Sequence, residues 1–318
     1  MHFDVFNGDA DGIIALLQLR LAEPKVSTLI TGVKRDIQLL QQVPVDKASS
    51  VTVLDISMEK NNAALGALLA EQVPVFYVDH HRSGDIPNSR HLTAIIDTDA
   101  NTCTSLLVNQ HLHGQYVLWA IVAAFGDNML STAQQLAKQQ GLSESEQAQL
   151  KALGIYINYN GYGRTVDDLH IAPAELFSNL LAYPNPFTLI HETNSIFSTL
   201  EQAYLQDMAQ AKQAKILHDD DALQVLVLDD APWSRRVSGV YGNELANHAP
   251  NKAHAILTLN MDGSYTVSLR APINNKIAAG ELCAQFDTGG GRAAAAGINQ
   301  LPKEMLGNFI ALVSNYYQ

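Results

Sequence analysis

The residues best suited to chemistry are Asp79-His80-His81, which follow the apolar run 75–78. A short run rich in β-branched and aromatic residues is typical of a buried strand. Carboxylate and imidazole groups at the carboxyl end of such a strand can bind a metal ion or move protons, and in an open parallel sheet this end borders the ligand crevice. The alternative is a strand-end cluster that only caps a loop, and other parts of the chain decide between the two.

Asp9 and Asp11 lie in a tight turn between a short apolar strand over 3–6 and a helix over 13–21 that is apolar nearly all round. Such a helix is buried on several sides. Two carboxylates held together raise each other's pKa unless a cation joins them. The turn therefore indicates a cation site, and the alternative is an Asp-Gly turn with a helix cap.

Asp55 follows the strand predicted over 51–54, and Asp127 follows an apolar helix over 116–125. Alternating strands and helices predict a doubly wound parallel sheet of five strands, and its right-handed crossovers place all carboxyl ends at one edge. The acidic residues and Asp79-His80-His81 should therefore converge on one crevice. The predicted strands are 3–6, 26–31, 51–54, 75–78 and 93–96, and the helices between them include 35–42 and 59–69.

The second half predicts a smaller α/β domain. A long helix over 194–217 with few breakers would connect a first domain, 1–193, to a second domain, 218–318. Strands are predicted over 223–228, 253–259 and 264–270. In this domain Gly289-Gly290-Gly291 would let the backbone approach a phosphate, and Arg292 would offer a planar fork to it. The alternative is a flexible turn with tight packing.

Composition limits the ligands. The chain has 318 residues, 47% of them hydrophobic, and a net charge of −12. A globally acidic protein repels long nucleic acid, so a nucleotide ligand should be short and held by a local cluster, although the charge can equally serve solubility. No apolar run approaches the ~20 residues that span a membrane, and the amino terminus lacks a signal-peptide pattern, so we expect a cytoplasmic protein without membrane partners.

These motifs together resemble the DHH phosphoesterase superfamily. Asp9-Ala10-Asp11, Asp55, Asp79-His80-His81 and Gly126-Asp127 look like its four ordered motifs. Three later stretches resemble the substrate-binding domain that follows the DHH domain in that superfamily: Ser268-Leu269-Arg270, Gly289-Gly290-Gly291 and Ala295-Ala296-Gly297. The resemblance spans nearly the whole chain. Its relatives include RecJ exonucleases, manganese-dependent pyrophosphatases and oligoribonucleases that degrade very short RNA, and the chain is most similar to the last.

The resemblance implies two Mn²⁺ ions that activate a hydroxide for in-line attack on phosphorus. Asp9 would bind the first ion and Asp55 would bridge both. The ligands of the second ion would be Asp11, His80 and Asp127. His81 would contact the scissile phosphate, with Asp79 orienting its imidazole. The far end of the substrate would meet Arg270, Gly289, Gly290, Gly291 and Arg292.

The chain departs from the family pattern at two positions. Val5 stands where many members have a histidine ligand of the first metal, and Asn7 is the nearest substitute, so the first site should be weak. Arg292 replaces the histidine that usually follows the triple glycine. Further candidate substrate contacts are Arg82 and the pair Arg235 and Arg236 beside Trp233, whose alternative is a solvated surface pair.

The expected activity is that of a Mn²⁺-dependent phosphodiesterase. It would hydrolyse dinucleotides such as linear pGpG, or very short oligoribonucleotides, to mononucleotides. Two alternatives stay open from the sequence: a phosphatase acting on 3′-phosphoadenosine 5′-phosphate, and a non-catalytic nucleotide sensor. The oligomeric state also stays open, a homodimer included.

Overall fold

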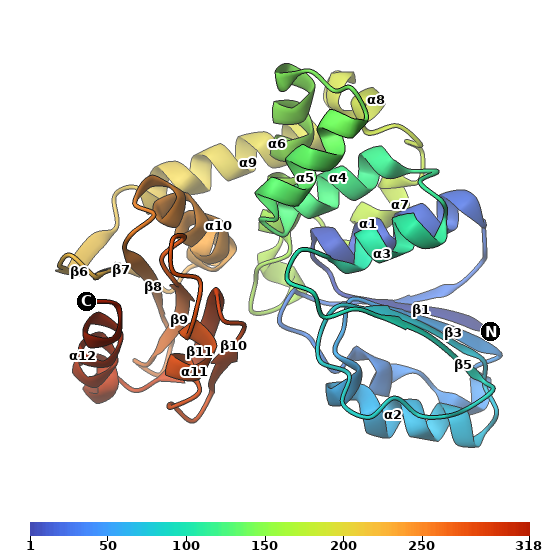
Figure 1. Cartoon of the computed structure of the whole chain (residues 1–318), viewed down its shortest axis with the longest axis horizontal. Coiled ribbons are helices and arrows are strands. Elements are labelled where there is room, and N and C mark those ends of the chain that lie inside the picture. Colours follow the sequence, from blue (N-terminus) through green and yellow to red (C-terminus); the bar gives the residue numbers. More distant parts are fainter. The chain divides into compact units, whose positions relative to one another are not determined.

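The computed structural model describes residues 1–318, which form two compact units, Met1–Gln202 and Ala203–Gln318 (Figure 1). The first unit contains a five-stranded sheet in the order β2-β1-β3-β4-β5. All neighbouring strands in it are parallel, which confirms the predicted doubly wound α/β class. The strands are β1 (His2–Phe6), β2 (Thr28–Ile30), β3 (Ser50–Leu54), β4 (Val75–Asp79) and β5 (Leu92–Ile96).

Helices cover both faces of this sheet (Figure 1). Helix α2 (Met58–Ala70) lies along one face, while α1 (Ala10–Ala22) and α3 (Thr104–His111) lie on the other. Helix α1 is buried from Ala10 to Arg20 and contacts several other helices, because its apolar residues leave no polar face. The remaining helices of the unit are α4 (Val117–Gly126), α5 (Leu130–Gln139), α6 (Glu144–Asn160), α7 (Pro173–Leu180) and α8 (Pro186–His191), with 3₁₀ turns η1 (Leu39–Gln42), η2 (Val45–Lys47) and η3 (Val166–Asp168).

The helix predicted over 35–42 is wrong, since only the 3₁₀ turn η1 forms there. The preceding segment is fixed as a loop by contacts with residues distant in sequence. A Cβ on Gly8 would lie 1.8 Å from the carbonyl oxygen of Gly32, so the β1–α1 turn and this loop touch through their backbones. The carboxylate of Asp36 also accepts the N–H of Val33 at 3.0 Å. These contacts outweigh the local helical preference.

The predicted connector helix over 194–217 is shorter in the structure. Helix α9 spans Ile196–Ala211, and the boundary between the two units falls within it. Residues 215–217 instead begin strand β6 (Lys215–Asp219), which pairs antiparallel with β7 (Leu223–Leu228). Ladder hydrogen bonds to β7 thus end the helical stretch earlier than the sequence pattern indicates.

The second unit contains a six-stranded sheet in the order β10-β11-β9-β8-β7-β6. Strands β7 and β8 are parallel and the other neighbours antiparallel. Its core joins the sheet to the last helix through side chains such as Leu223, Val267 and Phe309. The remaining elements are α10 (Pro232–His248), β8 (Ala253–Leu259), β9 (Tyr265–Arg270), α11 (Ala279–Cys283), β10 (Gly289–Gly291), β11 (Ala295–Leu301), η4 (Lys303–Met305) and α12 (Leu306–Tyr317). Across both units, every helix is too short or too polar to cross a membrane.

Candidate active site

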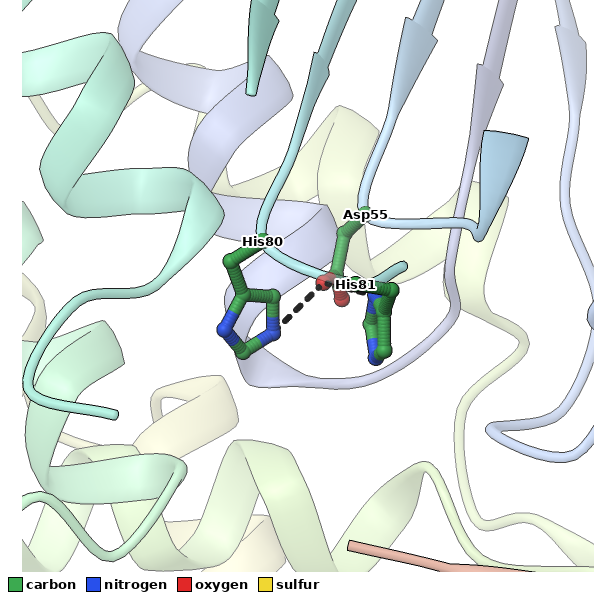
Figure 2. Close-up of side chains that lie close together, drawn as sticks. All are labelled: Asp55, His80 and His81. Carbon is green, nitrogen blue, oxygen red and sulfur yellow. Dashed lines mark ion pairs between the residues drawn. The ribbon is translucent and has the colours of Figure 1, made fainter. Parts of the chain in front are cut away.

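The carboxyl ends of β3 and β4 bring three side chains of the first unit together (Figure 2). Ligand atoms of Asp55, His80 and His81 all lie within 4.8 Å of one another. Asp55 follows β3 with a φ of 58°, a left-handed conformation that Asp and Asn tolerate better than most residues. Figure 2 shows its carboxylate directed toward the two imidazole rings. Two parallel strand ends therefore form a mixed carboxylate and imidazole cluster, as the sequence indicates.

His80 is held in the orientation of a metal ligand. Its Nδ1 lies 3.1 Å from the carbonyl oxygen of Thr102, and because a carbonyl can only accept, Nδ1 carries the proton. Its Nε2 lies 3.4 Å from Oδ1 of Asp55 and 3.8 Å from Oδ2 of Asp11. Nε2 therefore faces the carboxylates, and the hydrogen bond at Nδ1 is of the kind that fixes the ring of a ligating histidine.

His81 has a different partner. Its Nδ1 lies 2.7 Å from Oδ1 of Asp79, a fully buried carboxylate at the end of β4. Burial alone would lower the pKa of His81, but the hydrogen bond to Asp79 and the charge of Asp55 outweigh it and raise that pKa above its ordinary value. The side chain is 34% exposed. His81 can therefore present a proton to an anionic ligand.

The start of α3 holds Asp11 and Asp55, a contribution that the sequence analysis missed. The two oxygens of Asp11 accept the N–H groups of Ser105 and Thr104 at 2.7 and 2.8 Å. The hydroxyl of Thr104 also donates to Oδ1 of Asp55 at 3.1 Å. The Thr-Ser pair at the start of α3 is typical of a helix start, but nothing in it points to these distant acids.

The imidazole of His81, 3.9 Å from Oδ1 of Asp55, does not compensate for the burial of this carboxylate and for its acidic neighbours. Burial, followed by the neighbouring charges of Asp11 and Asp9, raises the pKa of Asp55 well above its ordinary value. A cation bound beside it would reverse this shift. The donor set of Asp55, Asp11 and the Nε2 of His80 thus fits a divalent ion of the oxygen- and imidazole-binding type, such as Mn²⁺.

Asp9, by contrast, already has a cation. Nζ of Lys34 lies 2.5 Å from Oδ2 of Asp9, 3.2 Å from Oδ1 of Asn158 and 3.6 Å from Oδ1 of Asp127. The other oxygen of Asp9 caps α1 by accepting the N–H groups of Asp11 and Gly12 at 3.0 and 3.1 Å. Burial would raise the pKa of Asp9, but the Lys34 ammonium outweighs it and lowers that pKa. These residues do not fit a metal ion at Asp9.

Val5 and Asn7, the residues at and near the missing histidine of the family pattern, have structural roles here. Val5 is fully buried and packs in an apolar cluster with Val53 and Tyr77. The side-chain oxygen of Asn7 accepts the N–H of Asp9 at 3.1 Å, and its amide donates to the carbonyl of Lys34 at 3.1 Å. Asn7 therefore fastens the Lys34 loop to the β1–α1 turn.

The candidate substrate residues of the second unit are largely engaged with their own unit. The guanidinium of Arg270 donates to Asn243 at 2.6 Å, to Ser268 at 3.1 Å and to the carbonyl of Gly239 at 3.2 Å. The glycine run forms strand β10, paired with β11, rather than a loop. Arg292, next to it, is exposed.

The arginine pair at the start of α10 does not form a solvated patch. Arg235 pairs with Asp230 at 2.5 Å, and the buried Arg236 pairs with Asp207 at 2.8 Å. In the first unit Arg82 is exposed, three residues after Asp79. The substrate roles of these arginines stay predictions.

Comparisons with known proteins agree with this architecture. Residues 221–318 match the DHHA1 domain family. No curated protein sequence matches the chain significantly. A structure of the exonuclease RecJ bound to manganese aligns with a TM-score of 0.61 and 15% identity, covering 99% of this chain and 90% of that one.

Two further structures are similar. RecJ from Thermus thermophilus, in complex with Mn²⁺, aligns with a TM-score of 0.61 and 16% identity; the alignment covers 99% of this chain but only 52% of that one. The pGpG-specific phosphodiesterase PggH from Vibrio cholerae aligns with a TM-score of 0.56 and 13% identity, over 100% of this chain and 99% of that one. At such identities the likeness establishes the fold. The match to the DHHA1 domain family thus lies within the second unit, and the chain as a whole has the fold of RecJ and PggH.

Proposed function

We propose that this protein is a divalent-metal-dependent phosphodiesterase that hydrolyses dinucleotides or very short oligoribonucleotides to mononucleotides. The observation that carries the proposal is the cluster of Asp55, His80 and His81, in which a buried carboxylate of raised pKa faces one imidazole oriented like a metal ligand and one that is hydrogen-bonded to Asp79. The match in length to PggH, a phosphodiesterase specific for the dinucleotide pGpG, supports the substrate class.

Each side chain would have a separate role in this reaction. A Mn²⁺ ion held by Asp55, Asp11 and His80 would supply Lewis acidity toward water and the phosphate. His81, with Nδ1 fixed by Asp79, would donate from Nε2 to a phosphate oxygen and stabilise its developing charge. The histidine that binds the ion and the histidine that binds phosphate thus come from adjacent positions of one strand end.

The charge of the chain supports a short substrate. With a net charge of −12, the protein repels a polyanion, and affinity for long nucleic acid depends on neutralising many phosphates. A dinucleotide needs few such contacts. Arg82 and Arg292 are both exposed, and the planar guanidinium of either would suit a terminal phosphate or a base of such a substrate.

The test is hydrolysis of end-labelled pGpG with Mn²⁺, followed by separation of the nucleotide products. Wild-type protein should release GMP, and Asp55→Asn should lower the rate at least about 100-fold, because losing even an outer-shell partner of a metal costs 10–100-fold. The matched control is Asp46→Asn, which makes the same change at a residue of η2 outside the site and should retain full activity.

Other substrates in the same assay decide between the remaining alternatives. Faster release of phosphate from 3′-phosphoadenosine 5′-phosphate than of GMP from pGpG would indicate a phosphatase. Binding of pGpG without turnover, unchanged by Asp55→Asn, would indicate a sensor and contradict the proposal.

A further inference from the structure

We propose that the Lys34 ammonium permanently replaces one of the two metal ions that the sequence resemblance implies, so that the site binds a single divalent ion at Asp55, Asp11 and His80. The inference deepens the proposed function and rests on its metal site. It does not depend on hydrolysis, because ion stoichiometry is measured without substrate.

Nζ of Lys34 is surrounded by side-chain oxygens and an aromatic ring. This atom lies within 4.0 Å of side-chain oxygens from Asp9, Asp127 and Asn158, which come from three separate segments of the chain. It also lies 5.4 Å from the ring centroid of Tyr162, within the range of a cation–π interaction. Two carboxylates, an amide oxygen and an aromatic face together form a binding site for one positive charge.

The backbone of Lys34 is fixed as well. Its N–H donates to the carbonyl of Gly161 at 2.8 Å, and its own carbonyl accepts from the side chain of Asn7 at 3.1 Å. Gly8 and Gly32 allow the two backbones to touch. A fixed backbone keeps the ammonium within reach of these oxygens, so Lys34 competes with a metal ion for them.

Asp9 differs from Asp11, whose oxygens also accept N–H groups, in having an ammonium as its partner. One of its oxygens caps α1 through two N–H groups, and the other accepts from Lys34. Val5, at the position of the usual histidine ligand, faces the apolar core and has no donor atom. The chain thus has an ammonium beside Asp9 and no histidine at position 5. This combination is expected if the side chain of Lys34 has replaced one metal ion.

The experiment counts Mn²⁺ ions per chain in the full-length protein, by calorimetric titration and elemental analysis. The electron paramagnetic resonance spectrum of the bound Mn²⁺ separates a lone ion from a coupled pair. Wild-type protein should bind one uncoupled ion. Lys34→Ala should admit a second ion, while Lys252→Ala, which removes a lysine paired with Asp219 in the second unit, should still bind one.

Asp9→Asn keeps the test decisive if Lys34→Ala fails to fold, because Asn caps a helix as well as Asp does. Under the proposal this variant still binds one ion. Two ions in the wild type, loss of an ion in Asp9→Asn, or a single ion in folded Lys34→Ala would each overturn the role of Lys34. No bound ion in the wild type would instead reject the metal site of the proposed function, and the inference with it.

Discussion

Asp9 and Asp55 occupy equivalent places in this protein but have opposite electrostatic states. Each is a buried carboxylate just beyond the carboxyl end of a central parallel strand, β1 or β3. The Lys34 ammonium lowers the pKa of Asp9, whereas burial and neighbouring carboxylates raise that of Asp55. At the same sheet edge, the negative charge of Asp9 is thus compensated by a cation, whereas that of Asp55 is not fully compensated.

The difference shows which part of an acidic cluster is available for chemistry. Around Asp9, the ammonium of Lys34 and the N–H groups at the start of α1 satisfy both oxygens. Around Asp55, the nearby nitrogens are Nε2 of His80 at 3.4 Å and Nδ1 of His81 at 3.9 Å, and they do not offset the burial and the acidic neighbours that raise the pKa of Asp55. Proximity of acids to one another therefore does not identify a metal site by itself, because an internal cation can already occupy it.

The largest effect that would test this comparison is on Mn²⁺ affinity. We expect His80→Ala to weaken binding by about 100-fold or more, since it removes a direct ligand, while Asp9→Asn changes affinity by less than about threefold. Calorimetric titration of both variants measures this. Equal losses of Mn²⁺ affinity in the two variants would show that Asp9 binds the metal as His80 does, and would contradict the difference between Asp9 and Asp55.

The next effect is on the stability of the metal-free protein, where the two acids should act with opposite sign. At pH 7 we expect Asp9→Asn to destabilise folding by about 2 kcal/mol, because Lys34 loses its nearest buried ionic partner. Asp55→Asn should stabilise it by about 1 kcal/mol, since it removes a buried carboxylate that lies close to other acids, and Asn tolerates the same left-handed backbone. Urea unfolding at fixed pH measures both changes.

The pH dependence of stability follows from the same two pKa shifts. The pKa of Asp9 is lowered on folding, so its contribution is present above the unfolded value near 3.8 and is lost as the pH falls through the lower folded pKa. The pKa of Asp55 is raised, so the metal-free protein gains stability as the pH falls through that higher value. Asp55→Asn should abolish the acid-side gain. If that gain remains in the variant, another group is responsible for it.

The smallest expected effect concerns His81. Because its folded pKa is raised, the imidazolium form persists to higher pH and should strengthen binding of a mononucleotide product. We expect affinity for GMP to fall about tenfold as the pH rises through this pKa, as loss of one partly exposed charge-assisted hydrogen bond implies. His81→Gln should bind GMP weakly at all pH values. Calorimetry at constant Mn²⁺ concentration measures both, and an unchanged pH profile in the variant would contradict the role of His81.

Much of the fold could be predicted because its signals are local. Short apolar runs and intervening helices indicated the parallel class of the first sheet, and the all-round apolar pattern over 13–21 identified a helix buried on several sides. The helix predicted over 35–42 was wrong, because the preceding loop is fixed by contacts with the β1–α1 turn and with Gly161. Local propensity does not contain those contacts.

The sequence by itself determined where the acids and histidines stand along the chain, and that the strand ends would gather Asp55, His80 and His81. Parallel topology makes that convergence unavoidable, since every crossover returns the chain to the same edge. Only the tertiary structure decided which acid is already neutralised. Lys34 reaches Asp9 and Asp127 from a loop whose sequence has no hydrophobic periodicity. Nothing in the sequence around a single lysine indicates which distant carboxylates its side chain will contact.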